Sequence, residues 1–195
     1  MSDVRVAVVT GGARGIGRGI ALMLAEPGTI VHVTDRDSRD QPHPVLPGTV
    51  EDTAEEVTAR GGTGIAHVID HTDDEAVVAL FVMTGYAVTE SAGHAFYNLA
   101  MNGISRLATA LSHDLAPHGV TALTLSPGFT STEAIRAAFG DTPLPPGVDT
   151  VEHVGNTVRA LWNDPNIGAL SGQTVTVAEL AERYRLTPDG QETTP

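Results

Sequence analysis

The stretch VRVAVVTGGARGIG, which spans residues 4–17, decides the fold. Residues 4–10 are mostly β-branched and predict a strand, and the apolar spacing of residues 16–25 predicts a helix packed on a sheet. Glycines between the two let the chain turn tightly, and the free amides at a helix N-terminus attract an anion. This order predicts a dinucleotide-binding turn. Its candidate cofactor-binding residues are Gly11, Arg14, Gly15, Ile16 and Gly17.

An acidic residue follows the second predicted strand, residues 29–34. Asp35 lies 18 residues beyond Gly17, where a carboxylate accepts hydrogen bonds from a ribose 2′-hydroxyl. This position favours NAD. Arg14 and Arg36 flank the same place and could neutralise a 2′-phosphate, so NADP stays open.

Alternating strands and helices along the whole chain predict an α/β fold. Parallel βαβ units give a doubly wound, mostly parallel sheet between two helix layers, a Rossmann-like three-layer arrangement. We expect one domain over residues 1–187 and a flexible tail over residues 188–195. Further predicted strands are residues 64–69, 81–84, 120–125 and 173–177. Further predicted helices are residues 51–60, 73–80, 97–115, 131–139, 151–163 and 178–184.

Composition excludes several classes of function. The 195 residues include 11 Lys+Arg and 24 Asp+Glu, a net charge of −13, which argues against nucleic-acid binding. All the basic residues are arginine, so lysine chemistry is excluded, and the absence of cysteine excludes disulfides and thiolate nucleophiles. The eight histidines lack metal-ligand spacing, and we expect no metal. With no membrane-spanning run or signal peptide, we expect a cytoplasmic protein.

The turn and two further motifs resemble the short-chain dehydrogenase/reductase family over most of the chain. Residues 10–17 match the family's TGxxxGIG turn, and Pro127 and Gly128 with Thr132 match its PG segment beside the nicotinamide. Asp70 and His71 match its acidic segment after the third strand, which contacts adenine. The resemblance implies an NAD(P)(H) cofactor and a small-molecule carbonyl or alcohol substrate.

The resemblance also implies catalytic residues. Tyr97 matches the tyrosine that exchanges the alcohol proton, and Thr84 stands about where the family places a serine that polarises the carbonyl. The family's lysine, four residues after the tyrosine, is replaced by Met101. A thioether carries no charge to lower a phenol pKa of about 10, so we expect slow proton transfer near neutral pH.

Between residues 80 and 81 the chain lacks segments that the family carries. The resemblance therefore implies that one strand and one helix of the family fold are missing, together with a wall of the nicotinamide pocket. The ten residues 71–80 barely allow the crossover, so strand 81–84 is displaced, the sheet is strained, or another chain fills the place. The family's pairing through the helix containing Tyr97 implies a homo-oligomer. Two alternatives stay open: a nucleotide-binding pseudoenzyme or interaction module, and a poorly folding product of an internally deleted gene.

Overall fold

The computed structural model describes residues 4–70 and 95–187, with side chains from residue 101 onward in the second range. The predicted helix 73–80, strand 81–84 and tail 188–195 lie outside the described residues. Within them, no helix is both long enough and apolar enough to cross a membrane.

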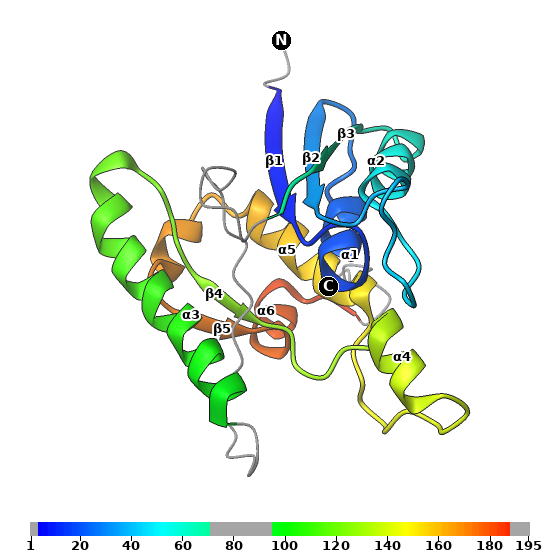
Figure 1. Cartoon of the computed structure of the whole chain (residues 1–195). Helices are drawn as coiled ribbons and strands as arrows, with labels where there is room; N and C mark the ends of the chain where they lie inside the picture. Colours follow the sequence, from blue (N-terminus) through cyan, green and yellow to red (C-terminus); the bar gives the residue numbers. More distant parts are fainter. Residues whose placement is uncertain (1–3, 71–94, 188–195) are drawn as a thin grey trace.

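Strands and helices alternate through the described residues, as the sequence predicts, apart from two successive helices between the fourth and fifth strands (Figure 1). The strands are β1 (Arg5–Thr10), β2 (Thr29–Asp35), β3 (Thr63–Val68), β4 (Thr124–Ser126) and β5 (Thr174–Thr176). The α-helices are α1 (Gly15–Met23), α2 (Val50–Ala59), α3 (Ala95–Leu115), α4 (Glu133–Phe139), α5 (Val151–Asn163) and α6 (Val177–Tyr184). Short 3₁₀ helices span Ala116–His118 and Ile167–Leu170.

The strands pair in parallel, in two separate sheets among the described residues. One sheet has the order β1-β2-β3, and the other consists of β4 and β5. In the first sheet Val8 lies opposite His32, and His32 lies opposite Ile65. The α/β fold with parallel strands is confirmed, although the described strands do not join into one continuous sheet.

The strand expected over residues 120–125 is shorter and lies later in the chain. β4 begins only at Thr124, whose amide donates to the carbonyl of Gln173. Val120 is 47% exposed. The apolar run is therefore longer than the segment that has a partner strand, and pairing with the three-residue β5 sets the length of β4.

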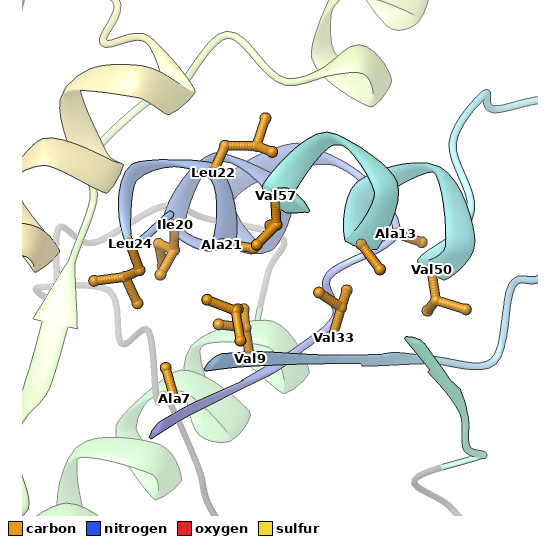
Figure 2. Close-up of a cluster of buried hydrophobic side chains, with 12 residues drawn as sticks. Ala7, Val9, Ala13, Ile20, Ala21, Leu22, Leu24, Val33, Val50 and Val57 are labelled. Carbon is orange, nitrogen blue, oxygen red and sulfur yellow. The ribbon is translucent and has the colours of Figure 1, made fainter. Parts of the chain in front are cut away.

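One hydrophobic core lies between the first sheet and helices α1 and α2 (Figure 2). Val9, Val31 and Val33 point from the sheet toward Ile20 of α1 and Val57 of α2, and all are almost completely buried. Each side chain of this size contributes about 1.5–3 kcal/mol on burial. The opposite face is more open, with Val6 52% exposed and Ile65 37% exposed.

A second core surrounds β4 and β5, and α5 connects it to the first. Val154 and Leu161 of α5 pack with Leu125 of β4, while Ile16 and Val158 contact both cores. At the other end of α5, Arg5 of β1 donates to the carbonyl of Trp162, and its guanidinium lies 4.4 Å from the centre of the indole ring. α5 therefore holds the two sheets in one structure.

The contact between α1 and α5 depends on glycine. A Cβ at Gly19 would lie 2.5 Å from the carbonyl oxygen of Val151, and one at Gly155 would lie 2.6 Å from that of Gly19. These are backbone atoms, so a side chain at either position would force the helices apart.

We predict that Gly19→Ala destabilises the protein by about 1–3 kcal/mol, because the overpacking outweighs alanine's helix propensity. Gly103→Ala is the matched control, since a Cβ there meets nothing within 4 Å in the middle of α3. It should be neutral or stabilising by up to about 1 kcal/mol. Urea unfolding measures both. Equal effects of the two substitutions would contradict the close helix contact.

Candidate functional site

The turn between β1 and α1 is built so that glycine is required. Gly15 has a φ of +57°, which side chains disfavour. A Cβ at Gly17 would lie 2.2 Å from the carbonyl oxygen of Gly11, so any larger residue would push the helix away from the turn. The turn thus brings the first-turn amides of α1, which have no partner within the helix, close to the end of β1.

Hydrogen bonds to the end of β2 hold this turn. The amide of Gly12 donates to the carbonyl of Thr34 at 3.1 Å, and that of Ala13 donates to Asp35 Oδ2 at 3.2 Å. Oδ1 of Asp35 accepts from the amide of Arg36 at 2.8 Å. The acidic residue that the sequence singles out is therefore fixed beside the glycine turn.

The two candidate arginines have different environments. Arg14 points into the loop before α2, where it donates to Asp37 at 2.5 Å and to the carbonyls of Pro47 and Gly48 at 2.9 and 2.8 Å. The side chain of Arg36 is 68% exposed and lies 3.8 Å from Asp37. Arg14 thus holds the loop, and Arg36 is the guanidinium open to solvent.

A segment more than 100 residues further along the chain meets the turn. Pro127 and Gly128 follow β4, and Thr132 caps α4 by accepting from the amide of Ile135 at 3.3 Å. The methyl group of Thr132 lies 3.6 Å from the place where a Cβ of Gly15 would stand. The fold therefore joins two motifs that are more than 100 residues apart.

Glu133 also lies at this junction, and sequence reasoning missed it. Its Oε2 accepts from the amide of Gly15 at 2.9 Å. The only signal available in the sequence is its place directly after Thr132. Its contact spans 118 residues of chain, and no local pattern encodes such a pairing.

The remaining candidates are only partly described. The amide of Ile69 donates to the carbonyl of Asp35 at 2.9 Å, which places Asp70, two residues beyond β3, near the end of β2. Tyr97 lies in the first turn of α3. Its side chain, His71 and Thr84 lie outside the described residues.

Met101 stands one helical turn after Tyr97 and is half-buried. Residues four apart lie on the same face of a helix, so Met101 stands on the face of α3 that also carries position 97. Because the side chain of methionine is uncharged, this position holds no cation.

We predict that Arg14→Gln destabilises the protein by about 2–3 kcal/mol, because it removes hydrogen bonds and leaves the buried Asp37 carboxylate with only the exposed Arg36 guanidinium, 3.8 Å away. Arg39→Gln is the matched control. Arg39 pairs with Asp52 and Glu55 at the surface, where its hydrogen bonds lower the pKa of Glu55. Such exposed pairs contribute less than about 1 kcal/mol. Thermal unfolding of both variants checks the difference.

Known proteins are similar to this chain over most of its length. No protein-family model matches it. Dehydrogenase/reductase SDR family member 1 of Mus musculus is 27% identical over an alignment of 266 positions, which covers 93% of this chain and 82% of the mouse protein. Because the chain has 195 residues, at least 71 of those positions have no counterpart in it.

Solved structures share the fold. A short-chain dehydrogenase from Mycobacterium thermoresistibile has a TM-score of 0.77 at 18% identity, covering 98% of this chain and 92% of that chain. One from Mycobacterium paratuberculosis, bound to NAD, has a TM-score of 0.65 at 18% identity, covering 93% and 99%. YwfH, an NADPH-dependent reductase involved in bacilysin biosynthesis, has a TM-score of 0.67 at 17% identity, covering 88% and 96%.

Proposed function

We propose that this chain, which belongs to the short-chain dehydrogenase/reductase family, binds a nicotinamide dinucleotide at its glycine turn and interconverts a small carbonyl compound and its alcohol. The observation that carries the proposal is that the glycine turn meets both Asp35, which accepts from the Ala13 amide, and Thr132, whose methyl group lies against Gly15. The family relationship supports an oxidoreductase over a protein that only binds nucleotides.

The turn fits the diphosphate of such a cofactor. Glycine at position 17 leaves the amides of the first turn of α1 within reach of a phosphate, and the helix dipole favours negative charge there. Gly11, Gly15, Ile16 and Gly17 would hold the diphosphate. Pro127, Gly128 and Thr132 would line the nicotinamide side, and Asp70 with His71 the adenine side.

Two carboxylates favour NAD over NADP. Asp35 is fixed beside the turn, where it would accept from a ribose hydroxyl and repel a 2′-phosphate. Asp37 lies two residues further on and already binds Arg14, which is therefore occupied. Arg36 alone would face a 2′-phosphate, with Asp37 3.8 Å from its guanidinium.

The cofactor and the protein would supply different steps of the reaction. The nicotinamide supplies or accepts the hydride when it is bound. Tyr97 would give or take the alcohol proton, and Thr84 would donate a hydrogen bond to the carbonyl oxygen. Because Met101 gives no positive charge, the phenol of Tyr97 lacks the electrostatic help that would ionise it near neutral pH.

Met101 is also the observation that favours the second candidate function, cofactor binding with little turnover. The turn and Asp35 serve both functions equally well. Turnover that depends on Tyr97 separates the two functions, because a protein that only binds the cofactor does not need the tyrosine hydroxyl.

We predict that the protein binds NADH more tightly than NADPH. Asp35→Asn should weaken NADH binding about tenfold and should reduce the difference in affinity between NADH and NADPH. Asp114→Asn, a change at an exposed position of α3, is the charge-matched control and should leave both affinities unchanged. Isothermal titration calorimetry measures the affinities of the unaltered protein and of both variants for NADH and for NADPH. A preference for NADPH in the unaltered protein would contradict the assignment of Asp35 to the ribose.

For catalysis, we predict that Met101→Lys raises turnover of a carbonyl panel with NADH near neutral pH, because the ammonium lowers the pKa of the Tyr97 phenol. Tyr97→Phe should abolish turnover in both backgrounds without weakening NADH binding. The rate of NADH consumption against pH checks this. Turnover that survives Tyr97→Phe would exclude Tyr97 as the proton carrier, and NADH binding with no turnover in any variant would favour the second function.

A further inference from the structure

An anion from the protein itself already occupies the N-terminus of α1. Glu133 Oε2 accepts from the amide of Gly15, the first residue of the helix, at 2.9 Å. α1 has no acidic residue in its own first turn, and the side chain of Arg14 does not cap it. The carboxylate of Glu133 therefore supplies the negative charge that this helix end attracts.

The position of Glu133 is set by contacts on both sides of it. Thr132 caps α4 and touches Gly15 through its methyl group, so α4 begins directly against the turn. The amide of Ser131 donates to the carbonyl of Asp149 at 2.8 Å, and its hydroxyl accepts from Arg136 at 2.8 Å. In the part of the chain that the structure describes, Glu133 forms no ion pair, and its partner is the Gly15 amide.

The proposed diphosphate and this carboxylate need the same group. One amide hydrogen cannot satisfy both anions, and two anions at one helix end repel each other, the more so in a chain of net charge −13. Asp35 does not compete with the diphosphate in this way, because its carboxylate accepts from the amide of Ala13 and lies on the ribose side of the turn.

We infer that Glu133 is an internal competitor of the coenzyme: its carboxylate caps α1 in the free protein and must leave the Gly15 amide before a diphosphate binds there. Glu133 thereby sets the affinity for the dinucleotide without touching substrate. The inference rests on the proposed function, because it takes the turn as the diphosphate site. The inference also requires α4, which begins at Glu133, to move when the dinucleotide binds.

The test measures the binding of NADH and of inorganic pyrophosphate by calorimetry to the full chain and its variants. Glu133→Gln removes the charge and should tighten binding of both ligands about tenfold. Glu133→Asp keeps the charge but shortens the side chain by one methylene, so it should tighten binding less. Glu152→Gln is the control, since Glu152 lies in the first turn of α5, and it should change neither affinity by more than about twofold.

A second readout uses the unliganded protein. Because Glu133 caps α1, Glu133→Gln should lower the midpoint of thermal unfolding by about 2–4 °C while it tightens NADH binding. A residue with a purely structural role would lower the midpoint and weaken binding. If Glu133→Gln does not fold, Glu133→Asp decides the matter by the same two measurements.

The outcomes separate the two proposals. NADH binding to the unaltered protein that Glu133→Gln leaves unchanged or weakens overturns the competition and leaves the proposed function standing. Binding of NADH only after Glu133→Gln supports the competition in its strongest form. Absence of NADH binding in the unaltered protein and in both Glu133 variants overturns the competition and the proposed function together.

Discussion

The hydrogen bonds that tie the glycine turn to the end of β2 are the constraint on which the rest of the site depends. The amides of Gly12 and Ala13 reach the Thr34 carbonyl and the Asp35 carboxylate, which fixes where α1 begins. The start of α1 in turn decides what its free amides face. Asp35 owes its place in the site to this connection, and Thr132 and Glu133 meet the turn at Gly15, where α1 begins.

Contacts of α5 hold the described part of the fold together. The mouse relative has at least 71 alignment positions without counterpart here, and the described strands form two sheets. α5 packs against α1 through Gly19 and Gly155 and against β4 through its other residues, so it connects the two halves. Among the described residues, the half of the fold that carries the glycine turn is therefore joined to β4 and β5 by α5 rather than by a continuous sheet.

Sequence alone predicted those parts of the molecule that depend on local pattern. The β1 strand, the glycine turn and α1 follow from hydrophobic spacing and from the glycines, and the structure has all three where expected. The family resemblance is confirmed, and the mouse relative is longer than this chain in the aligned region. The helix expected over residues 151–163 is observed with the same bounds, because its cap, Thr150, and its apolar face are both local.

Other parts depend on contacts that no local pattern encodes. The sequence offered Arg14 as a phosphate ligand, but its hydrogen bonds to Asp37, Pro47 and Gly48 arise only when the loop folds back on the turn. Glu133 was missed for the same reason, since its partner is 118 residues away. The length of β4 depended on a partner strand rather than on its own β-branched residues.

One measurement bears most directly on the central claim that the amides at the start of α1 receive the diphosphate of a nicotinamide coenzyme. In a two-dimensional ¹H–¹⁵N NMR titration of the full chain with NADH, the account predicts that the amide signals of Gly12 and of Gly15 to Gly17 shift most. Saturable shifts confined to other parts of the chain, with these amides unchanged, would contradict it.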